Sequence, residues 1–144
     1  MSSNCIFCEI VKGNIPCAKV YEDNDVLAFM DIGPVVKGHI LVIPKAHHNP
    51  ITETPAAVLQ KLIAVVQQVA RAQVTGLAAD GVNVSQANGE TAGQIVPHIH
   101  FHVIPRFAAD GHHRNWTPLK YTDSSEMNSY ADRIRQSFAQ RHHS

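Results

Sequence analysis

Three histidines alternate with apolar residues around position 100: His98, His100 and His102. Side chains alternate between the two faces of a β-strand, so a strand from Pro97 to Pro105 would place all three imidazoles on one face. Such a face is costly as plain core, because each imidazole carries polar nitrogens that need partners. A neutral imidazole is also a nucleophile at physiological pH. If a backbone carbonyl holds one ring nitrogen of the middle residue, His100, the other nitrogen can attack an electrophile. A structural or metal-binding face is the alternative.

A polar, glycine-rich loop from Asn88 to Gln94 lies just before the histidine segment. Gly89 and Gly93 allow backbone amides to approach an anion closely, and the Gln94 side chain adds a hydrogen-bond donor. A loop of this kind indicates only a turn when it stands alone. Its position beside the histidines predicts a phosphate-binding site.

Cys5 and Cys8 have the spacing of half a zinc site. His47 and His98 would complete a tetrahedral Cys2His2 set, with His48 as the alternative to His47. Four protein ligands leave no open position for water, so such a zinc ion would be structural. A pair of reduced thiols is the competing interpretation. A redox pair is disfavoured, because no strand precedes the motif as it does in thioredoxin-like sites.

Hydrophobic periodicity predicts the strands and helices that must position these groups. The expected strands cover residues 18–21, 26–32, 39–43, 81–86 and 97–105. The expected helices cover residues 5–12, 55–74 and 125–140. The first two strands flank a polar turn and are expected to pair antiparallel, while the third is apolar throughout, as expected for a central strand covered on both faces.

Capping signals predict where the first two helices begin and end. Asn4 is the expected N-cap of the first helix, and Gly13 its stop. Thr54 is the expected cap of the second helix and Gly76 its stop.

The composition limits the classes of protein that need considering. With 144 residues the chain can bury the core of one domain. Twelve Lys and Arg residues balance twelve Asp and Glu residues, so the net charge of zero argues against a nonspecific binder of nucleic acid. The sequence contains neither a signal-peptide pattern nor a run of apolar residues long enough for a membrane span, which predicts a cytoplasmic protein without a membrane partner.

The stretch from Gly93 to Arg106 resembles the signature of the histidine-triad (HIT) superfamily, in which the pattern H-x-H-x-H is followed by apolar residues. Further blocks resemble the bacterial Hint-like branch of this family. They lie at residues 5–11, 15–16, 20–23, 28–32 and 38–45. The resemblance covers roughly residues 5–106, so residues 1–144 are expected to form a single HIT domain with a core at about 5–106 and a C-terminal extension at 107–144.

This resemblance implies an α+β HIT-like fold, with an antiparallel sheet of about five strands, one long central helix and short N- and C-terminal helices. It further implies a homodimer across which the sheet is extended. The implied activity is hydrolysis of purine nucleoside phosphoramidates or related derivatives of nucleoside monophosphates, such as those of adenosine monophosphate. His100 matches the histidine that attacks the α-phosphorus, and water then resolves the nucleotidyl-histidine intermediate.

The resemblance also implies roles for other residues. His102 is similar to the histidine that contacts the phosphate and assists the leaving group, and His39 to a further active-site histidine. Asp31 matches the acid that hydrogen-bonds the ribose hydroxyls, which suits a carboxylate. The remaining expected nucleotide contacts are Asn88, Gly93, Gln94, Phe7 and Ile32. Some bacterial members carry zinc at the positions that match Cys5, Cys8, His47 and His98.

Two residues depart from the family pattern. Ala87 stands where members usually have Asn or Gln near the phosphate, and Ile95 stands where many have Ser or Thr. Each lost hydrogen bond to a charged group costs about 1.5–3 kcal/mol, so turnover could be slower unless Asn88 substitutes. A zinc-stabilised nucleotide-binding interaction protein with little turnover therefore remains open. A hydrolase of dinucleoside polyphosphates is a second enzymatic alternative.

Overall fold

The computed structural model describes residues 4–111 and 117–142, with side chains given up to residue 138. The chain divides into two compact units, residues 1–112 and residues 113–144. The expected extension at 107–144 thus includes positions outside the described residues. No helix in the described part of the chain is both long enough and apolar enough to cross a membrane.

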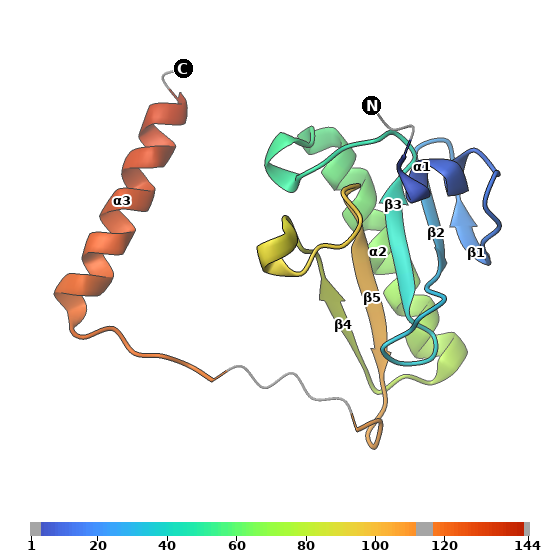
Figure 1. Cartoon of the computed structure of the whole chain (residues 1–144). Coiled ribbons are helices and arrows are strands. Elements are labelled where there is room, and N and C mark those ends of the chain that lie inside the picture. The colour runs from blue at the N-terminus through green and yellow to red at the C-terminus, as the bar shows by residue number, and fades with distance from the viewer. Residues whose placement is uncertain (1–3, 112–116, 143–144) are drawn as a thin grey trace. The chain divides into compact units, whose positions relative to one another are not determined.

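The first unit is built on one antiparallel sheet, as the sequence predicted (Figure 1). Its strands are β1 (Lys19–Glu22), β2 (Val26–Met30), β3 (Ile40–Pro44), β4 (Gly81–Ser85) and β5 (Phe101–Arg106). They pair in the spatial order β1-β2-β3-β5-β4. Every residue of β3 is buried, which confirms the prediction of a central strand covered on both faces.

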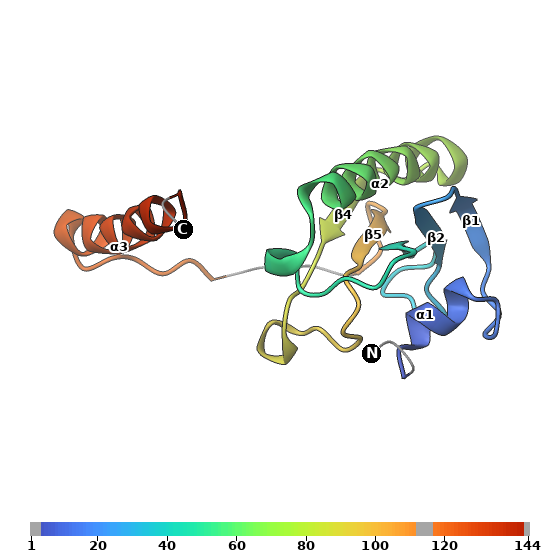
Figure 2. The same cartoon turned by 90° about the horizontal axis from the view of Figure 1, so that it is seen from above.

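Two helices cover opposite faces of this sheet (Figure 2). The long helix α2 (Ala56–Leu77) packs on one face, where its residues Leu62, Val65, Val66 and Val69 meet inward side chains of β2, β3 and β5. The short helix α1 (Ile6–Val11) packs on the other face through Phe7 and Ile10. Neighbouring residues of a strand therefore belong to different layers, as the period of two requires.

The ends of both helices differ from those predicted. Cys5, not Asn4, is the N-cap of α1, and its sulfur accepts a hydrogen bond from the Cys8 amide at 3.4 Å. The N-cap of α2 is Pro55. The Thr54 hydroxyl instead donates to the Pro50 carbonyl at 2.8 Å. Helix α2 also continues through Gly76 to Leu77, and its C-cap Ala78 adopts a left-handed φ of 57°.

The histidine segment is only partly a strand. β5 begins at Phe101, so His98 and His100 precede it and only His102 lies within it. The alternation of the side chains is retained nevertheless. Ile99 and Val103 pack in the core beneath α2, whereas His98 and His100 contact Phe7 of α1.

Two 3-10 helices interrupt the loops: η1 (Ile51–Glu53), before α2, and η2 (Glu90–Ala92), in the glycine-rich loop. The second unit contains helix α3 (Ser124–His142), where the sequence predicted a helix. Its apolar side chains Met127, Tyr130, Ile134 and Phe138 are all exposed.

Candidate active site

His100 is held in one tautomer by the backbone. Its Nδ1–H donates to the carbonyl of His98 at 2.7 Å, which leaves Nε2 with a free lone pair. The ring is buried and forms a T-shaped pair with Phe7, with ring centroids 5.1 Å apart. Burial lowers the pKa of His100, while the bond to His98 and the charge of Asp31 oppose that shift. The ring is therefore neutral at physiological pH, as a nucleophile must be.

His102 and His39 form a hydrogen-bonded pair beside His100. The rings of His100 and His102 have centroids 5.0 Å apart. The amide of Val35 donates to Nδ1 of His39 at 3.1 Å, so the proton of His39 lies on Nε2 and is donated to Nδ1 of His102 at 2.9 Å. Nε2 of His102 then carries a proton and is a donor.

Asp31 lies behind this pair. Its Oδ2 is 3.6 Å from Nε2 of His39, and its Oδ1 accepts from the amide of Gly33 at 2.8 Å. Burial is the main cause that lowers the pKa of His39, and the Asp31 charge opposes it. The side chain of Ile32, next to Asp31, is fully exposed at 101%. An apolar side chain beside a partly exposed carboxylate is an arrangement that suits a nucleoside.

The glycine-rich loop is stabilised by its own side chains. Gln94 is buried, and its amide nitrogen donates to Asn49 Oδ1 at 2.7 Å and to the Val96 carbonyl at 2.9 Å. Its oxygen accepts from the Gly89 amide at 2.7 Å. Both donor hydrogens of Gln94 are thus used within the loop, so its predicted contact with a phosphate would require one of these bonds to open.

Asn88 and Gly93 help to fix the conformation of the same loop. Asn88 Oδ1 accepts from the Ile51 amide at 2.8 Å, and Nδ2 donates to Gln86 Oε1 at 2.6 Å. Gly93 ends η2 with a left-handed φ of 95°, a conformation that favours glycine. The sequence did not indicate the contribution of Asn49, since an isolated Asn carries no pattern.

The predicted zinc ligands Cys5, Cys8, His47 and His98 lie together. One ligand atom from each falls within 4.8 Å of the others. Cys5 Sγ is 3.3 Å and Cys8 Sγ 3.6 Å from Nδ1 of His98, and Cys8 Sγ is 3.3 Å from Nδ1 of His47. Tetrahedral zinc with ordinary bond lengths separates sulfur and nitrogen ligands by about 3.6 Å, so the four residues fit this metal. His48, the alternative ligand, is not in the cluster.

A hydrogen bond at Nε2 of His98 leaves its Nδ1 available as a metal ligand. Its Nε2–H donates to the carbonyl of Pro44 at 2.9 Å, so Nδ1 faces the two sulfurs without a proton. The ring is fully buried, and burial lowers the pKa of His98 to about 4. The carbonyl of Pro44 gave no signal in the sequence, because every residue has such a group.

Comparison with known proteins places these features in one family. Residues 12–109 match the model of the HIT domain. The chain is 45% identical, over 103 residues, to the adenosine 5′-monophosphoramidase hnt1 of Schizosaccharomyces pombe, covering 72% of this chain and 74% of that protein. The crystal structure of SMU.412c from Streptococcus mutans superposes with a TM-score of 0.90 at 42% identity, covering 94% of this chain and 86% of the other.

A second solved structure is also similar to this chain. It is the zinc-bound histidine triad family protein of Mycobacterium smegmatis, which is 37% identical to this chain and superposes with a TM-score of 0.75. The alignment covers 95% of this chain and 99% of that protein.

Proposed function

The chain belongs to the HIT domain family, and from this premise we propose that it hydrolyses purine nucleoside phosphoramidates through a nucleotidyl-His100 intermediate. One observation carries the proposal. The bond from Nδ1–H of His100 to the His98 carbonyl leaves Nε2 of a buried, neutral imidazole free to attack. The phosphoramidase from fission yeast supports the choice of substrate class.

The first step forms a bond between Nε2 of His100 and the α-phosphorus while the phosphorus–nitrogen bond of the substrate breaks and the amine departs. Nδ1–H of His100 remains on the His98 carbonyl and stabilises the positive charge that develops on the ring. His102 presents Nε2–H, which can donate to a phosphoryl oxygen or to the departing nitrogen.

Water attacks the same phosphorus in the second step, and the bond to His100 breaks. The nucleoside monophosphate leaves and His100 is regenerated. Over the full cycle one water supplies the oxygen added to phosphorus and the proton gained by the amine. His39 keeps His102 in the required tautomer by donating to its Nδ1.

Asp31 and Ile32 would bind the nucleoside. The carboxylate of Asp31 retains lone pairs beyond its bond with Gly33, and these can accept from two ribose hydroxyls. Ile32 offers an exposed apolar face to the base, and Phe7 supports the nucleophile from beneath by its edge contact with His100. Asn88, Gly93 and Gln94 are the proposed phosphate-side contacts.

We also propose that Cys5, Cys8, His47 and His98 hold a structural zinc ion. The donor set, the separations of the ligand atoms and the tautomer of His98 fit this ion. Zinc would join α1 to the segment that carries the nucleophile. With four protein ligands it would provide no site for water or substrate.

Release of adenosine monophosphate from adenosine 5′-phosphoramidate tests the function. We expect turnover in the wild-type protein and its loss, by at least about a thousandfold, in His100→Ala, because no other group replaces the nucleophile. Rapid acid-free quenching should also trap a protein whose mass has increased by one adenylyl group, and His100→Ala should not acquire it.

The same assay separates the rival functions. Faster cleavage of a diadenosine polyphosphate than of the phosphoramidate would identify the chain as a hydrolase of dinucleoside polyphosphates. Nucleotide binding without turnover on either substrate would refute the hydrolase and favour an interaction protein.

A further inference from the structure

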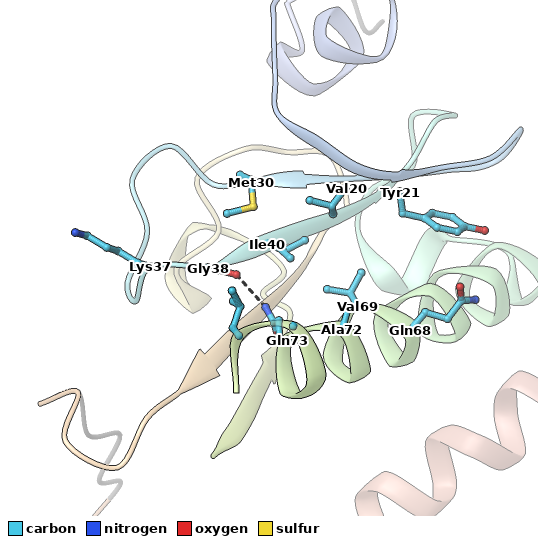
Figure 3. Close-up of a pocket in the computed structure, with 12 residues that line it drawn as sticks. Val20, Tyr21, Met30, Lys37, Gly38, Ile40, Gln68, Val69, Ala72 and Gln73 are labelled. Carbon is cyan, nitrogen blue, oxygen red and sulfur yellow. Dashed lines mark hydrogen bonds between the residues drawn. The ribbon is translucent and has the colours of Figure 1, made fainter. Parts of the chain in front are cut away.

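Gln73 is a buried polar residue on the inner face of α2, on the opposite side of the sheet from the histidines. Only 1% of it is exposed. It lies among the apolar residues of α2 and β3, close to Ile40 and Val69 (Figure 3). The proposed mechanism uses no atom of this side chain.

The amide nitrogen of Gln73 donates two hydrogen bonds. One goes to the carbonyl of Gly38 at 3.0 Å and the other to the carbonyl of Val103 at 2.9 Å; Figure 3 marks the first. Gly38 directly precedes His39, and Val103 directly follows His102. A single side chain thus fastens the backbone one residue away from each member of the His39–His102 pair.

The two bonds from Gln73, here called the clamp, join the segment just before β3 to β5, where the backbone pairing of these strands stops. The pairing of β3 with β5 ends at Ile40 and Val103. Two positions further, Gly38 lies opposite Pro105, which has no N–H to donate. The approach is close, since a Cβ on Gly38 would lie 3.0 Å from Pro105 Cγ and 2.7 Å from Leu77 Cδ1. Gln73 supplies from α2 a donor that β5 cannot supply.

This clamp has a cost that an apolar residue would avoid. The Oε1 atom of Gln73 is buried and has no hydrogen-bond partner among the residues described by the structure. A Met or Leu would fill similar space without burying an unpaired acceptor. The presence of an amide therefore points to its two donated bonds, not to packing.

We propose that Gln73 is a positioning residue, which sets the spacing of His39 and His102 by holding the carbonyls of Gly38 and Val103. Its kinetic consequence rests on the proposed function, but its structural consequence does not. The tautomers of His98 and His100 have separate anchors, the carbonyls of Pro44 and His98. Loss of Gln73 should therefore affect one histidine pair and spare the other.

Imidazole nitrogen chemical shifts, measured by NMR at one fixed pH, test the inference directly. In the wild type we expect His39 and His102 each as a single tautomer protonated at Nε2. In Gln73→Met we expect His102 to become a mixture of tautomers, because its bond from His39 is weakened. His39 keeps its bond from the Val35 amide, and the signals of His98 and His100 stay unchanged. Gln68→Met, which replaces an exposed amide of the same helix, should leave all four residues as in the wild type.

Steady-state kinetics provide the second readout. In Gln73→Met we expect kcat to fall by between about tenfold and about a hundredfold, and KM to change by less than about twofold. A displaced His102 slows the chemical step but has little effect on the affinity for the nucleotide. Gln73→Leu is a second apolar replacement. If one of the two variants does not fold, the other still tests the proposal.

The outcomes separate the two proposals. A wild-type tautomer at His102 in a folded Gln73 variant would overturn the positioning role. A raised KM with unchanged kcat would overturn it as well. If the wild-type protein is inactive but Gln73→Met still changes the tautomer of His102, the phosphoramidase function is refuted and the positioning role of Gln73 stands.

Discussion

Three histidines of one short segment differ in which ring nitrogen is hydrogen-bonded to a neighbour. The Pro44 carbonyl accepts a hydrogen bond from Nε2–H of His98, so Nδ1 of His98 faces the two sulfurs. The His98 carbonyl takes Nδ1 of His100 and leaves Nε2 free, while His39 donates to Nδ1 of His102. The spacing in the sequence predicted that these rings act together. It could not assign tautomers, because backbone carbonyls are present at every position.

Ala87 directly precedes the glycine-rich loop. In Ala87→Asn we expect kcat/KM for the phosphoramidate to rise about tenfold, because the new amide adds a donor beside Asn88, a proposed phosphate-side contact. The gain corresponds to one hydrogen bond to a charged group. Steady-state rates with adenosine 5′-phosphoramidate measure it.

Ala92→Asn is the control, since it places the same side chain in the 3-10 helix η2 of the neighbouring loop. We expect it to leave the rate within about twofold of the wild type. Equal rates for Ala87→Asn and the wild type would show that Asn88 already performs the missing role, or that the phosphate does not lie against this loop.

The elements themselves were largely predictable from the sequence, and their ends were not. Apolar runs indicated β3 and α2, because burial on both faces and a helical stripe leave clear periodicities. The predicted caps were wrong for physical reasons. The sulfur of Cys5 can accept from the Cys8 amide as an oxygen would, and Thr54 bonds instead to Pro50. Helix α2 passes Gly76 because its next turn still packs, through Leu77, close to Gly38.

Helix α1 should depend on the proposed zinc ion. Its six residues are too few to be stable alone, and only Phe7, Cys8 and Ile10 are buried. We predict that the purified protein contains about one zinc ion per chain, and that Cys8→Ser loses the metal. The melting temperature should then fall by roughly 5–10 °C, as expected for a loss of about 2 kcal/mol.

Cys17→Ser is the control for this change. Cys17 is a free cysteine of intermediate exposure that does not belong to the cluster of four ligands. Its replacement should preserve both the zinc content and the melting temperature. Zinc content near zero in wild-type protein prepared with zinc present would contradict the proposal, and so would a Cys8→Ser variant that melts like the wild type.

The balanced charge and the layers of the molecule would make the proposed binding of phosphate local. Equal numbers of basic and acidic residues provide no general attraction for polyanions. The candidate nucleophile lies on the face of the sheet that α1 covers, and the clamp at Gln73 lies on the face that α2 covers. Both layers therefore contribute to one site, although only one of them carries its chemistry.

The edges of the sheet bear on assembly, because an unpaired edge strand is a template for another chain. The two edge strands are β1 and β4. Strand β1 is short, and its register with β2 shifts between Lys19 and Tyr21, an irregularity of the kind that blunts an edge. Strand β4 is regular over its five residues and exposes Val84.

We therefore propose a homodimer in which two copies of β4 extend the sheet, and light scattering should give twice the chain mass of 15.8 kDa. In Val84→Lys we expect a shift toward monomer, because two like charges would meet where the edges join. Val20→Lys is the matched control on β1, since Val20 and Val84 are 49% and 47% exposed. A monomeric wild type would refute the dimer. Dissociation by Val20→Lys but not by Val84→Lys would place the interface at the opposite edge.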